Sequence, residues 1–472
     1  MSAAHAYARA HADRFREQLA ELLAIPSVST QPEHGADVRR AAAWLVADMR
    51  RIGLARAETF EQPGFLPIVY GEWLGAGPGA PTVLIYSHYD VQPAALEDGW
   101  HSDPFTPVER EGRLYARGAL DSKCHVVAWL KAAEALLAAG GAPVNIKLLF
   151  EGEEESGSEH IFGFLKANPE LVRADVCVVS DGSMPDPQQP ILVYGLRGIV
   201  TFELEVTGPA HDLHSGHYGG TVHNPIQALV ELLAGLHDAD GRVTVPGFYD
   251  DVQPLTDAER ASLAAVAAWA ESEWRMVAGA PEPWGEPGYA LHERISARPT
   301  LELNGIAGGF YGQGFKTVLP ARALAKLSCR LVPRQDPARI AAALRAEVAR
   351  RTPPTVNSVL RVLEDGAPGV LLDRASAAMQ TAARAYERGW GCSPLFTREG
   401  GSIPVVDVFQ RIPGAPIVLM PFGYKGGRAH GPDEYIYLEM FHKGIDTALY
   451  FMQLLAAQPP GAAAPAGSPA ER

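Results

Sequence analysis

The chain has 472 residues, of which 47% are hydrophobic, and its formal net charge is −14. The length exceeds one ordinary hydrophobic core and predicts two domains, while the composition is typical of a globular protein. The negative charge argues against partners such as nucleic acid or an anionic membrane surface. No stretch reaches the roughly 18 apolar residues that a membrane span requires.

The cysteines and the first 24 residues bear on the cellular compartment. The four cysteines lie far apart and form no Cys-x-x-Cys pair, so they predict neither a zinc finger nor a disulfide framework. Charges interrupt the first 24 residues, which lack the apolar segment of a signal peptide. We therefore expect a protein of a reducing compartment, the cytoplasm.

Helices and short apolar strands alternate in the first part of the chain and again near its end. Periodicity predicts helices over residues 11–24, 37–52, 125–139 and 373–387 and strands over residues 81–86, 144–150, 174–179 and 415–420. Such alternation predicts an α/β fold, with a mostly parallel sheet flanked by helices.

The pattern changes after residue 198. Strands are expected over residues 199–206, 323–332 and 357–364, helices over residues 225–236 and 337–350, and a further short strand over residues 316–320. The resulting β-α-β-β-α-β order predicts an α+β two-layer domain inserted into the first domain. The stretch 246–299, rich in Trp, Glu, Gly and Pro, receives no role.

The predicted parallel strands all lead to residues of the types that commonly bind metals. The strand over residues 144–150 runs into Glu151-Gly152-Glu153-Glu154-Glu155, where four carboxylates repel one another unless a cation neutralises them. The other three strands lead to His88-Tyr89-Asp90, to Asp181 and to His430. Each motif alone has a plainer interpretation, such as a solvated loop, a structural histidine or a turn. Because ligands bind beyond the carboxyl ends of parallel strands, one shared metal site explains all of them better.

Asp121 precedes the helix over residues 125–139, where a helix N-cap is the simpler role. Together, however, the motifs resemble the dinuclear-zinc metallopeptidases that include carnosinase-type dipeptidases, aminoacylases, glutamate carboxypeptidase and succinyl-diaminopimelate desuccinylase. The set comprises His88-x-Asp90, Arg117-Gly118-Ala119-x-Asp121, Glu151-Gly152-x-Glu154-Glu155-Ser156-Gly157-Ser158, Ser180-Asp181 and His430. Residues 194–198, 212–216, 330–333 and 397–404 are most similar to the carnosinase-type dipeptidases.

The resemblance implies two Zn²⁺ ions per subunit, and Mn²⁺ or Co²⁺ would suit the same ligands. Asp121 would bridge the two ions, with His88 and Asp181 completing one site and Glu155 and His430 the other. Glu154 would be the general base, with Glu153 as the alternative, and Asp90 would orient His88.

The resemblance also assigns residues of the inserted domain and of the glycine-rich turn. His214 from the other subunit of a homodimer would stabilise the oxyanion, although a surface histidine is its plainer interpretation. Arg330, with Gly401 and Ser402, would hold the carboxylate of the substrate, and Arg398 is a further candidate for substrate binding.

We accordingly expect residues 1–198 and 369–457 to form the catalytic domain, residues 199–368 a lid and dimerisation domain, and residues 458–472 a disordered tail. The expected activity is metal-dependent hydrolysis of dipeptides or short peptides with a free C-terminal carboxylate. An N-acyl-amino-acid amidohydrolase would use the same site. A non-catalytic metal-binding relative is a weaker alternative because every ligand and base position is filled, and a metal-free aspartic-type hydrolase would leave His88 and His430 unexplained.

Overall fold

The computed structural model describes residues 2–363, 366–412 and 414–458, and the chain in it folds into two compact units. The first unit comprises the part before Gly195, the segment Leu372–Thr397 and the part from Val408 onward. The second unit comprises Gly195–Leu371 and Arg398–Asp407. Apart from Gln458, the predicted tail lies outside the described residues.

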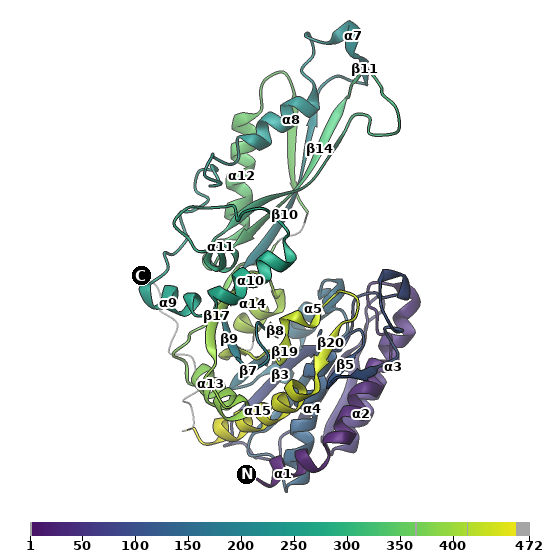
Figure 1. Ribbon diagram of the computed structural model, residues 1–472, viewed down its shortest axis with the longest axis vertical. Helices are drawn as coiled ribbons and strands as arrows, with labels where there is room; N and C mark the ends of the chain where they lie inside the picture. The colour runs from purple at the N-terminus through teal and green to yellow at the C-terminus, as the bar shows by residue number, and fades with distance from the viewer. Residues whose placement is uncertain (1, 364–365, 413, 459–472) are drawn as a thin grey trace. The chain divides into compact units, whose positions relative to one another are not determined.

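The first unit is built on a mixed sheet with the strand order β1-β2-β6-β3-β7-β18-β9 (Figure 1). The strands are β1 (Arg56–Phe60), β2 (Ile68–Trp73), β6 (Asn145–Glu151), β3 (Thr82–His88), β7 (Val176–Val179), β18 (Ile417–Leu419) and β9 (Ile191–Leu196), with β17 (Leu395–Glu399) also paired to β9. The last two residues of β9, Gly195 and Leu196, pair with β16 (Val370–Leu371) within the second unit. The four central strands, β6, β3, β7 and β18, are parallel to one another. The predicted parallel sheet is thus confirmed at its centre, while β1, β2 and β9 pair antiparallel.

The central strands are buried along almost their whole length because helices cover both faces of the sheet. Every residue of β6 and β7 is buried. Gly71 of β2 lies against Met49, whereas the hydroxyl of the preceding residue, Tyr70, donates to the carbonyl of Leu171 from the opposite face. This alternation is expected for neighbouring residues of a strand.

The helices of the first unit include those expected from the sequence, with ends shifted by a few residues. They are α1 (Ala3–Ala10), α2 (Ala12–Leu23), α3 (Gly35–Arg51), α4 (Lys123–Ala138), α5 (Glu159–Ala167), α6 (Pro169–Val172), α13 (Ala377–Trp390) and α15 (Leu438–Ala456). α15 packs between α4 and α13, as Figure 1 shows. No helix among the described residues is both long and apolar enough to cross a membrane.

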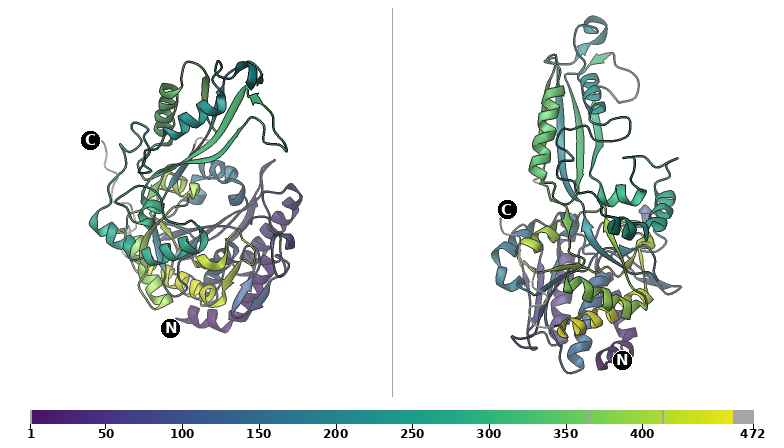
Figure 2. Two further views of the ribbon diagram at one scale, coloured as in Figure 1. Left: turned by 45° about the horizontal axis from the view of Figure 1, so that its top comes forward. Right: turned by 90° about the vertical axis from the view of Figure 1, so that its left-hand side faces the viewer.

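The second unit is the predicted two-layer α+β arrangement (Figure 2). Its antiparallel sheet has the order β12-β14-β10-β15, formed by β12 (Thr300–Gly308), β14 (Arg322–Leu331), β10 (Gly198–Thr207) and β15 (Asn357–Val362). Alternate residues of β10 and β14 are buried in one core with apolar residues of α8 (Pro225–Ala234) and α12 (Pro337–Arg351). Both helices therefore cover the same face of the sheet.

One predicted strand of this sheet was wrong. Residues 318 and 319 form β13 (Val318–Leu319), which pairs with β11 (Leu213–His214) in a separate two-stranded ribbon. The strand that completes the sheet is β12, an edge strand with a register shift between Leu303 and Gly305. The stretch 246–299 that received no role contains α9 (Asp257–Ala264), α10 (Ala267–Val277) and α11 (Leu291–Ala297).

Candidate metal centre

Adjacent parallel strands deliver the candidate ligands at one edge of the first unit's sheet. His88 is the last residue of β3, Glu155 follows β6 by four residues, and Asp181 follows β7 by two. His430 lies eleven residues beyond β18, after β19 (Gly423–Tyr424) and a short 3₁₀ helix, Lys425–Gly427. The order β6-β3-β7-β18 therefore places the segments that carry these residues side by side.

The first ligand group consists of His88, Asp121 and Asp181, whose potential ligand atoms all lie within 4.8 Å of one another. His88 Nε2 lies 3.0 Å from Asp121 Oδ1 and 3.9 Å from Asp181 Oδ1. The other ring nitrogen, Nδ1, lies 3.1 Å from the carbonyl oxygen of Asp90 and 3.4 Å from its Oδ1. Asp90 thus turns Nε2 toward the carboxylates, as a partner of a metal-binding histidine does.

The second ligand group consists of Asp121, Glu155 and His430, also within 4.8 Å. His430 Nε2 lies 3.0 Å from Asp121 Oδ2 and 3.2 Å from Glu155 Oε1. Gln92, which the sequence did not single out, donates from Nε2 to Glu155 Oε2 at 2.8 Å. Asp121 therefore offers one carboxylate oxygen to each group, the arrangement expected of a ligand that bridges two cations.

The electrostatics of the centre favour a bound cation. Burial, with the nearby charges of Asp181, Asp90 and Glu155, raises the pKa of Glu154 to about 8. Burial and the neighbouring carboxylate of Asp121 raise the pKa of Asp181 to about 6. Such crowding disfavours the ionised carboxylates, and a cation removes this penalty. Imidazole nitrogens and carboxylate oxygens suit Zn²⁺ and also Mn²⁺ or Co²⁺.

The three consecutive glutamates have different surroundings. Glu155 is held by Gln92 and belongs to the second ligand group. Glu153 is turned toward His160, with 3.7 Å between its Oε2 and His160 Nδ1. The carboxylate of Glu154 belongs to neither ligand group and accepts no hydrogen bond from the described residues, although its backbone N–H donates to Asp90 Oδ1 at 3.2 Å.

Three predicted residues of the second unit lie together. Arg330 Nη1 donates to Ser402 Oγ at 2.9 Å, and Ser402 Oγ donates to the carbonyl of Arg197 at 2.6 Å. Gly401, next to Ser402, has open space where a side chain would begin. Arg330 forms no ion pair with a carboxylate of the described residues, and burial lowers its pKa. This half-buried cation is thus available to an anionic group.

The other two predicted residues of this unit have different environments. Arg398 is buried and forms an ion pair with Glu259 of α9, so part of the unassigned stretch 246–299 neutralises this arginine. His214 is exposed at the end of β11, where its Nδ1 accepts a hydrogen bond from the backbone N–H of Gly216 at 3.0 Å. Its ring lies against His217, with 4.7 Å between the ring centroids.

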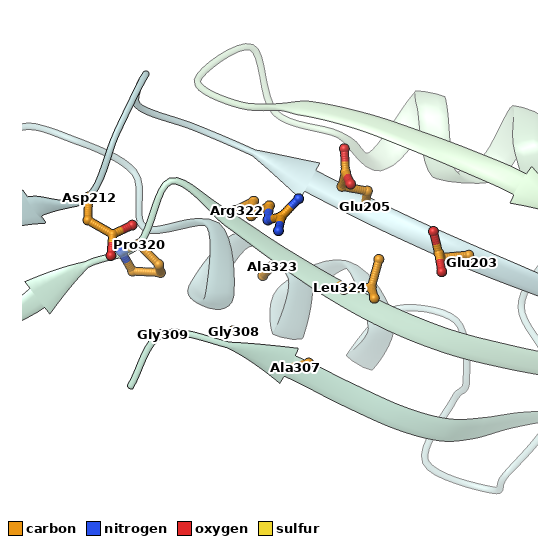
Figure 3. Close-up of a pocket in the computed structure, with 10 residues that line it drawn as sticks. All are labelled: Glu203, Glu205, Asp212, Ala307, Gly308, Gly309, Pro320, Arg322, Ala323 and Leu324. Atoms are coloured by element: carbon orange, nitrogen blue, oxygen red, sulfur yellow. The ribbon is translucent and has the colours of Figure 1, made fainter. Parts of the chain in front are cut away.

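A pocket of about 420 Å³ in the second unit is lined by residues other than those of the sites described above (Figure 3). Its charged lining residues are Glu203, Glu205, Asp212 and Arg322, and it includes none of the candidate ligands. Lys326 already pairs with Glu203, at 2.6 Å between Nζ and Oε2. We assign no ligand to this pocket.

The chain is similar to known peptidases over most of its length. The model of peptidase family M20/M25/M40 matches residues 84–454. The chain is 35% identical over 471 residues to the Cys-Gly metallodipeptidase dug1 of Schizosaccharomyces pombe, covering 95% of this chain and 97% of that protein. Among solved structures, human carnosine dipeptidase 1 is 31% identical with a TM-score of 0.78, covering 96% of this chain and 98% of the other. The metallo-carboxypeptidase Sso-CP2 from Sulfolobus solfataricus is 29% identical with a TM-score of 0.83, covering 94% and 99%.

Proposed function

The chain belongs to peptidase family M20/M25/M40, and from this premise we propose that it is a metal-dependent dipeptidase that cleaves dipeptides or short peptides with a free C-terminal carboxylate. The observation that carries the proposal is Asp121, whose two carboxylate oxygens each face one of two groups of potential metal ligands. The names of the relatives support the substrate class, because two are dipeptidases and a third is a carboxypeptidase. Each matches this chain over nearly its full length.

In this proposal His88, Asp121 and Asp181 hold one divalent cation, and Asp121, Glu155 and His430 hold the other. The cations, for which Zn²⁺ is our first choice, would supply a water of lowered pKa and would polarise the scissile carbonyl. Asp90 fixes the ring of His88 so that Nε2 faces the carboxylates.

Glu154 performs the proton transfers. Its carboxylate is close to both ligand groups without belonging to either, and no hydrogen bond from the described residues competes for it. Glu154 takes the proton of the attacking water and passes it to the departing amine, as a positioned general base does. Glu153 is less suited to this role because its carboxylate is turned toward His160.

Residues of the second unit bind the substrate and the oxyanion. The guanidinium of Arg330 holds the C-terminal carboxylate together with Ser402 and Gly401, a task that suits its planar fork of donors. His214, supplied by the other subunit of a homodimer, donates to the developing oxyanion. Arg398, whose guanidinium pairs with Glu259, is a further residue proposed for substrate binding. A reducing compartment such as the cytoplasm fits the four cysteines, all of which are free thiols.

The test is release of free amine from a panel of dipeptides and from N-acyl derivatives of the same C-terminal amino acids. The protein is first treated with a chelator and then supplied with Zn²⁺, Mn²⁺ or Co²⁺. We expect hydrolysis of dipeptides that disappears with the chelator and returns with metal. Preference for the N-acyl substrates would identify an amidohydrolase with the same centre, and metal-independent hydrolysis would refute the mechanism.

A further inference from the structure

Glu434 is a buried carboxylate that the sequence did not single out and that the reaction as described above does not use. Its residue is 0% exposed. The carboxylate accepts hydrogen bonds from the backbone N–H groups of Gly118 at 3.0 Å, Leu120 at 2.8 Å and Asp121 at 3.0 Å. It also accepts one from Arg117 Nη1 at 2.6 Å. Four donors thus converge on one side chain, and a buried carboxylate requires such hydrogen bonds to offset the loss of water.

The donors belong to the segment that carries the bridging ligand. Three N–H groups within four consecutive residues turn toward the same carboxylate, so Glu434 fixes the backbone of residues 118–121 from inside the fold. Anion-binding concavities of protein backbone are built in the same way. Because one of these N–H groups belongs to Asp121, the bonds act directly on the residue that faces both ligand groups.

Glu434 also belongs to the loop that carries His430. This loop contains three non-glycine residues in the left-handed region, Arg428 at φ 62°, His430 at φ 61° and Asp433 at φ 56°. Such backbone persists only where surrounding contacts determine it. The carbonyl of Glu434 accepts from the N–H of Ala116 at 3.1 Å, so both its side chain and its backbone join the His430 loop to the Asp121 segment.

We propose that Glu434 is a positioning residue that holds Asp121 and His430 in the relative geometry needed to bind two cations. This role rests on the metal centre of the proposed function. Glu434 touches no substrate and ligates no metal; it acts through the backbone of the bridging ligand. It is therefore expected to set metal affinity, in the way that partners of metal ligands commonly do.

The test is metal affinity in Glu434→Gln, measured by competition between the protein and a fluorescent zinc chelator, together with the absorption spectrum of the Co²⁺ form. Glutamine keeps the size but loses the charge, and its NH₂ group would face backbone donors. We expect affinity to fall about 10- to 100-fold, the usual effect of such a partner, and the Co²⁺ spectrum to change. Glu434→Asp keeps the charge on a shorter side chain and should recover part of the affinity.

A matched control separates positioning from general loss of stability. Asp48 is also buried and accepts from Lys131 Nζ at 2.6 Å, but none of its hydrogen-bond partners is a candidate metal ligand. Asp48→Asn should lower the melting temperature of the metal-free protein while leaving zinc affinity within about threefold. Equal zinc affinity in parent and Glu434→Gln, or an equal loss in Asp48→Asn, would overturn the positioning role. Absence of metal binding in the parent would instead refute the proposed metal centre.

A measurement on the unmodified chain covers the case in which Glu434→Gln does not fold. Hydrogen exchange of the metal-free protein, followed by mass spectrometry on peptides spanning residues 116–123, reports on the three N–H groups directly. If Glu434 holds the segment in advance, these amides are protected without metal. Rapid exchange that slows only after Zn²⁺ is added would mean that metal organises the segment and Glu434 does not.

Discussion

The assignment of the general base yields the sharpest prediction, because the chain supplies its own control one residue away. Glu154→Gln removes a buried carboxylate that belongs to neither ligand group and accepts no hydrogen bond from the described residues. The change therefore leaves both ligand sets complete and removes one negative charge from their vicinity. We expect metal content to be retained, because neither ligand group loses a member.

Turnover, in contrast, should collapse. A positioned general base contributes about 10²- to 10⁴-fold to the rate, which corresponds to about 2.7–5.5 kcal/mol of the activation barrier. The loss should fall on kcat and on kcat/KM together, because the proton transfer occurs in the transition state and substrate binding does not involve Glu154.

The assay follows amine release from a good dipeptide substrate for the parent, Glu154→Gln and Glu153→Gln, each with its metal content measured. Glu153→Gln changes the same charge in the same turn, but this side chain is turned toward His160. We expect it to retain kcat within a few-fold of the parent. Turnover of Glu154→Gln within about tenfold of the parent, with two metals bound, would refute its role as base. Equal inactivation of both variants would mean that the turn as a whole, rather than Glu154, is required.

Three further predictions concern other parts of the chain. His214→Ala should retain metal but lose turnover. When it is mixed with inactive Glu154→Gln and the subunits exchange, each mixed dimer has one intact site, so about a quarter of all sites should regain activity. Recovery of no activity would exclude a role in trans. Arg330→Met should lower kcat/KM for a dipeptide about 10- to 150-fold, as expected for a hydrogen bond between charged groups worth about 1.5–3 kcal/mol. The kcat/KM for the same dipeptide with a C-terminal amide should change little. Equal losses for the two substrates would exclude carboxylate recognition. Burial lowers the pKa of His125 to about 4, and its Nε2 accepts from the N–H of Phe422. The folded chain therefore keeps this ring neutral while the unfolded chain protonates it below about pH 6.5, so about 3 kcal/mol of stability present above pH 6.5 is lost as the pH falls to 4. Urea unfolding of the metal-free parent should show this loss relative to His125→Gln, and parallel pH profiles would contradict it.

The sequence indicated which side chains lie together at the edge of the sheet where residue type and strand position coincide. The buried strands β3, β6 and β7 are rich in apolar residues, and each leads to a residue whose type suits a metal. Residues that follow the carboxyl ends of adjacent parallel strands lie close together at one edge of the sheet. The inserted domain was predicted from alternation, which β10 and β14 show clearly because one face of each is buried.

Parts of the structure that depend on partners distant in sequence escaped prediction. β12 contains Asn304-Gly305 and is largely exposed, so its sequence has the character of a turn rather than of a strand. Glu434 follows His430 by four residues, but no spacing rule relates it to N–H groups more than 300 residues earlier. Likewise, the ion pair between Arg398 and Glu259 joins segments 139 residues apart. Such pairs become visible only in three dimensions.

The two ligand groups differ in how readily water reaches them. His88 has a side chain that is 1% exposed, whereas that of His430 is 53% exposed. An ion on the His430 side would be held by an imidazole that solvent reaches, whereas the imidazole that holds an ion at His88 is enclosed. Exchange at the centre should therefore be sequential, with the outer position emptying first under dilute chelator and the inner one later. This asymmetry would allow two different metals to be loaded in a chosen order. A spectroscopically visible ion such as Co²⁺ could then be placed at one known position with Zn²⁺ at the other.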